Sequence, residues 1–405
     1  MKRLPAAILL LIVFVSCNNS NGEKKPITSV VKQLPSPATG SCAEPFLFSD
    51  KNELVYLSWI EKKDTGNILK FSSLVNDHWT EPMAIASGNN WFVNWADYPV
   101  VVSDGNKNLM AHYLEKSAVS TYAYDVKYIT SSDKGKSWSN SKILHDDGKQ
   151  AEHGFVSMMP YGDKFFVSWL DGRNTATEEN SKGHEGHHGQ MTIRGAILGK
   201  DGIKENEWEL DNRVCDCCQT SAAITNNGPV VVYRDRSDVE IRDMSIVRYV
   251  KGEWTEPKTI FPDNWKIAGC PVNGPRADAM GNNLAIAWFS MSDKKGQVKI
   301  IFSEDGGATF NKPVRIDEGN AIGRVDIAML DEKTAMASWM ESGEIKAVKV
   351  HADGTKEPSI TIASSSESRS SGFPQMTKSG NKIFFAWTDE KTKAIRAASL
   401  FIKKT

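Results

Sequence analysis

Residues 164–169 read KFFVSW, and residues 382–387 read KIFFAW. The same kind of short apolar run, ending in Trp or Tyr, returns along the chain at intervals of roughly 55 residues. The other copies are LVYLSW (54–59), NLMAHY (108–113), PVVVY (229–233), NLAIAW (283–288) and TAMASW (334–339). Short runs that are rich in β-branched and aromatic side chains and are bounded by Gly, Asn and Asp are typical of strands.

The neighbours of each run repeat with it. One candidate strand precedes the run and another follows it, and most units add a fourth that opens with an aromatic residue or Pro, as in WTEPMAIA (79–86) and WTEPKTIF (254–261). Four short strands per unit, repeated many times, predict an all-β fold, a β-propeller whose radial closure protects the sheet edges. We expect seven four-stranded blades; six is the alternative, if one weak unit is an insertion.

The last unit stops after three strands, and the missing strand has a candidate at the other end of the chain. Residues 26–34 read PITSVVKQL and could pair with the C-terminal blade. The sequence therefore predicts a single propeller domain over 26–405, with the ring closed by the N-terminal strand.

The N-terminus predicts export. A short positive start and an apolar run over 4–15, too short to span a bilayer comfortably, indicate a signal peptide at 1–16. The pair Ser16-Cys17 resembles the cleavage site of bacterial lipoproteins, so we expect Cys17 to be lipidated; a plain signal peptide is the alternative. The polar segment 17–38 is expected to be a tether that holds the protein at a membrane of the bacterial cell envelope.

Two connections between third and fourth strands share a pattern. They read SSDKGKSW (131–138) and SEDGGATF (303–310). Asp accepts hydrogen bonds from amides of its own turn, Gly supplies positive φ and the aromatic ring packs under the turn, so the pattern is structural. Its positions are Ser131, Asp133, Gly135 and Trp138, and Ser303, Asp305, Gly307 and Phe310. Both copies resemble the Asp-box, or BNR repeat, of sialidase-like β-propellers, and the repeat extends over 42–401.

The resemblance also implies a chemistry that this sequence matches poorly. Sialidases as a family use an arginine triad to clamp a carboxylate, a Tyr nucleophile activated by Glu, and an Asp acid/base. Their opening Phe/Tyr-Arg-Ile-Pro motif is replaced by CAEP (42–45), and no Tyr follows Tyr249. The remaining catalytic candidates are Asp171, Glu152, Arg234, Arg276 and Arg324. For the arginines, a structural role in ion pairs is the alternative.

Cysteines and histidines are predicted to gather on one face. Cys215, Cys217, Cys218 and Cys270 lie in connections that enter the first strand of a blade. In a propeller these connections share a face with the loops between second and third strands, one of which contains HEGHH (184–188). Thiolate and imidazole together suit zinc or copper. The expected metal ligands are Cys215, Cys217, Cys218, Cys270, His184, His187 and His188.

Disulfides are the alternative explanation for this cluster. Exported cysteines usually pair, so Cys218 could bond to Cys270, or Cys215 to Cys217 or Cys218. The HEGHH loop would then bind metal only incidentally. The count leaves both explanations open, because five mature cysteines, Cys42 included, leave at least one unpaired thiol in a monomer.

Further residues on the same face are candidates for binding a ligand: His153, Arg173, Arg213 and Asn273. The triplet Asp171-Gly172-Arg173 closes a second strand just before the His-rich loop, so its charges could reach the propeller axis. An ordinary turn is the alternative for this triplet.

The function is expected to depend on this face. A formal net charge of −1 gives no reason to expect nucleic acid as a partner. We expect a binding or accessory protein of the cell envelope that holds a metal, a glycan or another small ligand there. The alternatives are a glycoside hydrolase that acts on exported glycans and a scaffold that docks a partner protein. The propeller itself does not decide among them.

Overall fold

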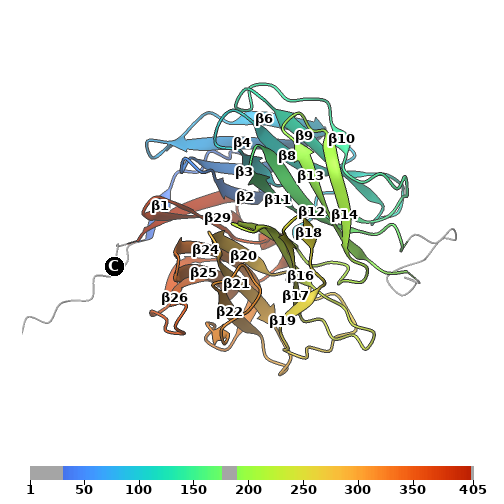
Figure 1. Cartoon of the computed structure of the whole chain (residues 1–405). Coiled ribbons are helices and arrows are strands. Elements are labelled where there is room, and N and C mark those ends of the chain that lie inside the picture. Colours follow the sequence, from blue (N-terminus) through green and yellow to red (C-terminus); the bar gives the residue numbers. More distant parts are fainter. Residues whose placement is uncertain (1–30, 176–188, 403–405) are drawn as a thin grey trace, which may run out of the picture.

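The computed structural model describes residues 31–175 and 189–402. The predicted signal peptide, Cys17, residues 26–30 and the HEGHH sequence (184–188) lie outside the described residues. The described part of the chain forms seven antiparallel sheets arranged as a propeller (Figure 1). The predicted all-β fold and the count of seven blades, rather than six, are confirmed.

Each blade is built from consecutive strands, numbered in chain order from the inside of the ring outward. Blades 1 and 2 consist of β2 (Cys42–Ser49), β3 (Val55–Lys63), β4 (Gly66–Val75), β5 (His78–Trp79) and β6 (Met83–Gly88), and of β7 (Val101–Ser103), β8 (Leu109–Lys116), β9 (Tyr124–Ser131) and β10 (Lys142–Ile143). Blades 3 and 4 consist of β11 (His153–Tyr161), β12 (Lys164–Asp171), β13 (Thr192–Gly199) and β14 (Lys204–Asp211), and of β15 (Ser221–Thr225), β16 (Gly228–Arg234), β17 (Met244–Val250), β18 (Glu253–Trp254) and β19 (Lys258–Phe261).

The remaining blades follow the same plan. Blades 5 and 6 consist of β20 (Arg276–Met280), β21 (Asn283–Ser290), β22 (Gln297–Ser303) and β23 (Val314–Arg315), and of β24 (Ala321–Asp331), β25 (Thr334–Glu341), β26 (Glu344–His351) and β27 (Ile360–Ser364). Blade 7 contains β28 (Gln375–Ser379), β29 (Lys382–Asp389) and β30 (Ala394–Phe401), preceded by the short helix η2 (Arg369–Ser371).

The N-terminal strand closes the ring. β1 (Val31–Leu34) pairs antiparallel with β30, from Val31 opposite Leu400 to Leu34 opposite Ala397, and so becomes the outer strand of blade 7. Figure 1 shows the blue N-terminal strand against the red C-terminal blade. Backbone groups at the outer edge of β30 are thereby paired, which explains why the last unit needs only three strands of its own.

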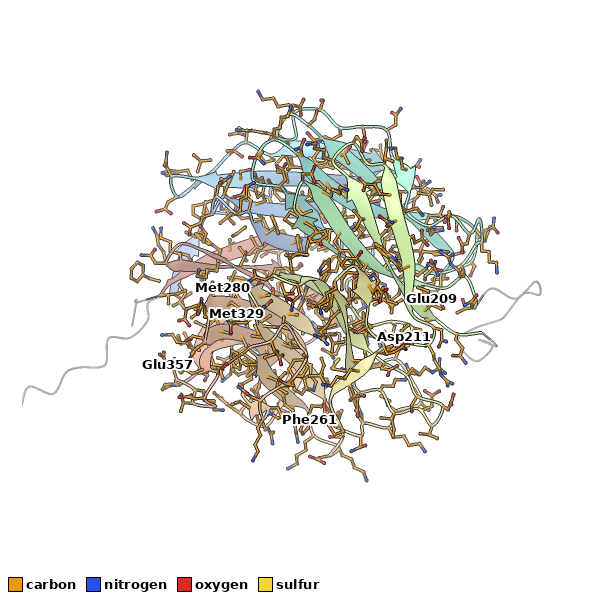
Figure 2. All side chains as sticks on the ribbon, viewed as in Figure 1. Glu209, Asp211, Phe261, Met280, Met329 and Glu357 are labelled. Atoms are coloured by element: carbon orange, nitrogen blue, oxygen red, sulfur yellow. The ribbon has the colours of Figure 1, made fainter. Side chains whose placement is uncertain are left out.

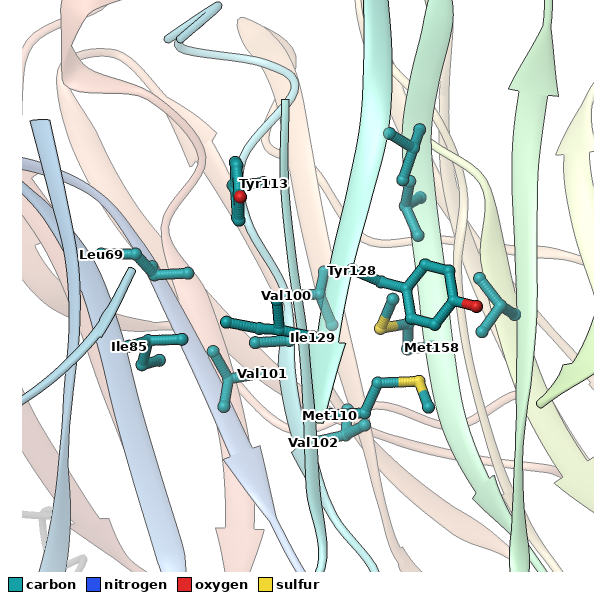
Figure 3. Packing of buried hydrophobic residues seen from close by; sticks show 14 of the residues in the cluster. Leu69, Ile85, Val100, Val101, Val102, Met110, Tyr113, Tyr128, Ile129 and Met158 are labelled. Atoms are coloured by element: carbon teal, nitrogen blue, oxygen red, sulfur yellow. The ribbon is translucent and has the colours of Figure 1, made fainter. Parts of the chain in front are cut away.

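The aromatic residues that mark the repeat lie in the core between blades. All seven are buried: Trp59, Tyr113, Trp169, Tyr233, Trp288, Trp339 and Trp387. Figure 3 shows how one such region is filled, with Leu69 and Ile85 from blade 1 facing Val101 and Ile129 from blade 2. Second strands are therefore mostly apolar over their central residues, because both of their faces pack against a neighbouring blade.

Side chains link the innermost strands around the ring. Asp278 on β20 accepts a hydrogen bond from the backbone N–H of Met329 on β24, at 2.7 Å. Asp326 on β24 accepts one in turn from the N–H of Met376 on β28, at 2.6 Å. Ser157 and Ser221 make equivalent links from β11 to β15 and from β15 to β20. We call this series the inner belt; it satisfies backbone donors at strand edges that no sheet pairs.

The two Asp-box turns adopt the same structure. In each, the first Ser donates to the Asp carboxylate at 2.8 Å, and the carboxylate accepts the hydroxyl of Ser137 or Thr309 at 2.6 Å. They lie at the end of the molecule opposite the connections between blades. The outer strands, such as β19 with Phe261, lie at the periphery (Figure 2). Among the described residues, no helix has the length and apolar character needed to cross a bilayer.

Candidate thiolate and acid/base site on the upper face

The site lies on what we call the upper face, the end of the ring that carries the connections between blades and the loops between second and third strands. A pocket of about 690 Å³ opens there, with walls from the connections that enter blades 2, 3, 4, 5 and 7. We call it the upper pocket. Its lining combines reactive groups with aromatic rings: Tyr124, Glu152, Cys217, Arg242, Cys270, Phe92, Trp95 and Tyr122.

Three cysteine sulfurs converge at the wall of this pocket. Cys215 follows β14, and its N–H donates to the carbonyl of Arg234 at 3.0 Å, which fixes the chain to the end of β16. A turn at 216–217 then brings Cys218 back against Cys215, with 3.4 Å between the two sulfurs. The sulfurs of Cys215, Cys217 and Cys218 all lie within 4.8 Å of one another, close enough to hold one metal ion.

The structure also places Cys270 with this group. Cys270 comes from the connection between β19 and β20, is exposed, and lines the same pocket as Cys217. The five described cysteines are free thiols. Cys42 stands apart from the cluster, buried at the start of β2, where its thiol donates to the carbonyl of Thr39.

The charge environment favours a thiolate at Cys215. The Arg242 guanidinium donates to its sulfur from Nη1 at 3.2 Å. Burial opposes ionisation, but hydrogen bonds from the neighbouring thiols and the charges of Arg242 and Arg234 outweigh it, so the pKa of Cys215 is well below its usual range. Burial, followed by hydrogen bonding to Cys215, raises the pKa of Cys217 and of Cys218. The site therefore favours one thiolate, at Cys215, beside two thiols that hold their protons more tightly.

Gln219 fixes the thiol turn to its neighbours. Its side-chain amide donates to the carbonyl of Ala96 at 2.7 Å, and its side-chain oxygen accepts the N–H of Gly274 at 2.9 Å. The connections into blades 2, 4 and 5 are thereby joined at one residue, directly after Cys218. A turn anchored on three sides positions its sulfurs with little freedom to move apart.

A hydrogen-bonded acid pair forms another wall of the upper pocket. Tyr124, at the start of β9, directs its hydroxyl at Glu152 Oε1 (2.9 Å) and at Asp97 Oδ2 (3.3 Å). Asp97 also accepts the N–H of Phe155 at 2.8 Å, which fixes its carboxyl group. The Tyr124 hydroxyl carries one proton, so it can donate a hydrogen bond to only one of the two carboxyl groups at a time.

Burial makes these carboxyl groups weak acids. Desolvation raises the pKa of Glu152 to about 8 and the pKa of Asp97 to about 7. Burial and the two nearby carboxyl groups raise the pKa of Tyr124 well above its usual value. At neutral pH, Glu152 therefore retains a proton that it can donate to a ligand, as a general acid does.

The arginines predicted as catalytic candidates have structural partners. Arg234 is buried and donates to the carbonyls of Asn273, Arg242 and Phe289. Arg324 donates to the Ser371 hydroxyl and to the carbonyl of Gly372, and its guanidinium lies over the ring of Trp95. Burial lowers the pKa of Arg324 to about 10.

Arg276 occupies the propeller axis instead. It donates to the hydroxyl of Tyr98 and to the side-chain oxygen of Gln375, and its Nε lies 3.8 Å from Asp326. Arg276, Asp326 and Gln375 line the pocket that the innermost strands form around the propeller axis.

The candidates for ligand binding are divided among several places. Asn273 links the connection into blade 5 to β24, since its Oδ1 accepts the N–H of Arg324 at 2.7 Å. Arg213 pairs with Asp238 in a shallower depression beside the upper pocket. Arg173 donates to the carboxylate of Asp171 through Nε and Nη2, both at 2.8 Å. Of the described candidates outside the thiol group, Glu152 is the one that lines the upper pocket.

Sequence reasoning missed several residues of the site. Asp97 and Tyr124 belong to no motif, and their pairing with Glu152 joins segments that are far apart in the chain. Arg242 stands just before β17 and looked like an ordinary loop cation. A weak signal did exist for Asp97, because the stretch from Trp91 to Tyr98 is an aromatic-rich connection into a blade, which the fold places on the upper face.

The chain matches no protein-family model and no curated protein sequence. Its fold is similar to that of the polysaccharide lyase Uly1, with a TM-score of 0.55 and 9% identity over 89% of this chain and 90% of the other. The α-L-arabinanase of Penicillium chrysogenum gives a TM-score of 0.50 and 10% identity over 94% and 99%. The NanB sialidase of Streptococcus pneumoniae gives 0.47 and 10% over 92% and 94%. At these identities the similarity shows the fold alone, that of a β-propeller.

Proposed function

We propose that this protein is an exported, lipid-anchored binding protein of the bacterial cell envelope that holds a soft metal ion in the upper pocket. The observation that carries the proposal is the convergence of the Cys215, Cys217 and Cys218 sulfurs within 4.8 Å, with Cys270 beside them. Thiolates prefer Cu(I) and zinc over hard cations such as magnesium and calcium. The ligands are therefore sulfur and the expected ion is copper or zinc.

The surroundings of the sulfurs support an ion at this place. Metal binding requires deprotonated thiols, and Arg242 and Arg234 supply the positive charge that stabilises thiolates in a buried setting. Cys217 and Cys270 face the open volume of the upper pocket, so an ion can enter from the upper face without unfolding. Cys215 and Cys218 lie behind them and are buried.

A disulfide between Cys215 and Cys218 competes with this function for the same sulfurs. Their contact at 3.4 Å allows oxidation to join them with a small movement. An oxidised protein would keep too few thiolates at the turn for a stable ion. The proposal therefore concerns the reduced protein, and thiol quantification must accompany every metal measurement.

The test is metal analysis of untagged protein purified under reducing, anaerobic conditions. We expect about one equivalent of bound copper or zinc after loading and desalting. Cys217→Ser should lower this content at least about tenfold, because it removes the ligand that faces the pocket. Cys42→Ser is the matched control, since Cys42 is buried but remote from the cluster, and it should retain the ion. Less than about a tenth of an equivalent in reduced wild-type protein would remove the metal function.

Membrane anchoring rests on Cys17 and has its own test. Cells given a clickable fatty acid should label the wild-type protein, and Cys17→Ala should abolish the label and leave the protein in the soluble fraction. Equal labelling of both proteins would contradict the lipid anchor. The metal site would be unaffected by that result.

A second candidate function is cleavage of exported glycans. The observation that favours it is the Tyr124, Glu152 and Asp97 group, which presents a protonated carboxyl group in a pocket with aromatic walls. Glycosidic cleavage needs such an acid for the leaving oxygen, and aromatic side chains stack on sugar rings.

Glu152→Gln tests this second function. The wild type should release reducing ends from a panel of neutral and acidic polysaccharides, at a rate that falls as pH rises past about 8, where Glu152 loses its proton. The variant should lose activity by at least about a hundredfold while it retains its metal content. A wild type with no turnover on the whole panel would eliminate the enzyme candidate.

A further inference from the structure

A second group of titratable side chains lies beside the upper pocket and belongs to neither function proposed above. Its centre is a pair of histidine rings: His145, in the connection between β10 and β11, and His153, the first residue of β11. The two rings are stacked, with centroids 3.5 Å apart and planes inclined by 2°. Both side chains are buried, so no solvent water competes for their nitrogen atoms.

All four ring nitrogens of the pair face oxygen atoms. His145 Nδ1 lies 2.7 Å from Asp147 Oδ1, and its Nε2 lies 3.4 Å from Asp125 Oδ1. His153 Nε2 lies 3.0 Å from Asp147 Oδ2 and 3.6 Å from Asp171 Oδ1. His153 Nδ1 lies 3.2 Å from the carbonyl oxygen of Ala151. Carbonyl and carboxylate oxygens only accept hydrogen bonds, so a nitrogen that faces them at hydrogen-bond distance is best matched by an N–H. His145 Nε2 is close to Asp125 but makes no hydrogen bond with it.

The carboxylates around the pair favour a cationic ring. Asp125, Asp147 and Asp171 are each held ionised, since their pKa values lie below the usual range. Hydrogen bonds from the two histidines contribute to the low pKa of Asp147, against the opposing effect of burial. Arg173, paired with Asp171, supplies one positive charge. A cationic His145 ring, which lies between Asp125 and Asp147, supplies a second.

Other charged groups face this cluster from every element that packs on it. They are Glu115 on β8, Lys127 on β9, Asp146 and Lys149 in the connection after β10, Arg194 on β13, and Lys204, Glu207 and Glu209 on β14. Lys204 pairs with both Asp146 and Glu207, and Glu207 also accepts from Arg173. These partners offset one another and leave the balance of the central groups unchanged.

Protons fit this cluster better than a metal ion does. A ring nitrogen binds a metal in the plane of the ring, and two stacked rings direct their in-plane lone pairs along parallel lines rather than toward one point. The oxygens of Asp171 are also occupied, by Arg173 and by the indole N–H of Trp169 at 2.9 Å. The carboxylates thus already have cationic and N–H partners.

The cluster is connected to the wall of the upper pocket through the backbone. Asp125 directly follows Tyr124, and His153 directly follows Glu152. The N–H of Tyr124 donates to the carbonyl of Ala151 at 3.1 Å, and the N–H of Gly172 donates to the carbonyl of Glu152 at 2.8 Å. Whatever holds the histidine pair in place therefore also holds the Tyr124 and Glu152 side chains.

We propose that the stacked pair of His145 and His153 holds the Tyr124–Glu152 wall of the upper pocket through a protonated His145 ring, and that loss of the His145 proton at alkaline pH loosens the wall. A neutral ring would direct a lone pair at a carboxylate or carbonyl oxygen, which is repulsive. The pocket is then tight in acid and neutral solution and opens locally as pH rises.

The direction of the pH effect follows from His145. Burial lowers the pKa of His145, but its contacts with the Asp125 and Asp147 carboxylates outweigh burial and raise the pKa above the usual value of 6.5. A group whose pKa is raised by folding stabilises the fold fully below its unfolded pKa. That stabilisation is lost as pH rises through the folded pKa. We therefore expect this stabilisation to be lost at pH values above 6.5.

Nitrogen NMR of the full chain labelled at histidine tests the protonation state. At pH 6 the ring of His145 should carry two N–H groups, and its signals should change to those of a neutral ring only at higher pH. His153→Gln and His145→Gln serve to assign the signals. A neutral His145 ring in the folded wild type at pH 6 would overturn the proposal.

Hydrogen exchange tests whether the Tyr124–Glu152 wall loosens as pH rises. After correction for the chemical effect of pH, amide exchange in segments 144–153 and 171–175 should accelerate at least about tenfold between pH 6 and pH 9 in the wild type. His112→Gln is the control: His112 is also buried, but its Nδ1 accepts the N–H of Val100 and burial lowers its pKa to about 3, so it is neutral throughout. Its variant should retain the wild-type response. Exchange that stays constant across this range would refute the loosening, whatever the metal content.

Discussion

At the scale of single residues, Arg242 shows how one side chain sets the chemistry of the thiol cluster. It lies just before β17 and donates to Cys215 Sγ at 3.2 Å while Glu240 holds its other nitrogen at 2.8 Å. The same guanidinium lines the upper pocket. A fixed positive charge beside a buried sulfur is what makes a thiolate stable there, so the metal affinity should depend on it.

Arg242→Gln should weaken binding of copper or zinc by about tenfold at neutral pH, because it removes a charge-assisted hydrogen bond to the thiolate. The deficit should grow from pH 8 to pH 6, since the Cys215 thiol then regains its proton more readily. Competition with a chromogenic chelator measures both effects. Arg315→Gln, which breaks an outer-strand pair with Asp317, is the control and should bind like the wild type. Equal affinities for the two variants would show that Arg242 has no role.

At the scale of elements, the repeat was readable because each blade obeys the same local physics. Second strands such as β12 and β29 are buried over most of their length and carry Trp169 and Trp387, since both of their faces are covered. Closure by β1 followed from counting strands in the last unit. The inner belt could not be predicted, because Asp278 and Asp326 look like ordinary strand polar residues until the blades meet around the axis.

We expect the inner belt to contribute to the free energy of unfolding. Asp278→Ala should lower the free energy of unfolding by about 1–3 kcal/mol, because the N–H of Met329 loses its hydrogen-bond acceptor. Asp278→Asn keeps an acceptor oxygen and should be much less harmful. Denaturant titration at pH 7 measures the difference.

The pH dependence of the same variants provides a check. Burial raises the pKa of Asp278 to about 6, so the folded wild type binds a proton more tightly than the unfolded chain does. The wild type therefore loses stability as pH rises from about 4 to about 6. Asn carries no such proton and its variant should lack this loss. If the Ala variant matched the wild type at every pH, the belt would have no energetic role.

At the scale of the whole molecule, ring closure is what turns scattered sequence signals into a site. The cysteines were predicted to meet because connections into successive blades share one face, and the structure places four of them in or beside the upper pocket. The acid group and the histidine pair were not predicted as units. Each depends on tertiary contacts between blades 2 and 3 that no spacing in the sequence reveals.

X-ray absorption spectroscopy of the reduced protein, loaded with one equivalent of copper or zinc, tests the thiolate metal site most directly. We expect a first coordination shell dominated by sulfur, at about 2.3 Å, that loses sulfur in Cys217→Ser and is unchanged in Cys42→Ser. A shell made of nitrogen and oxygen alone, the same in both variants, would contradict a metal site built from these cysteines.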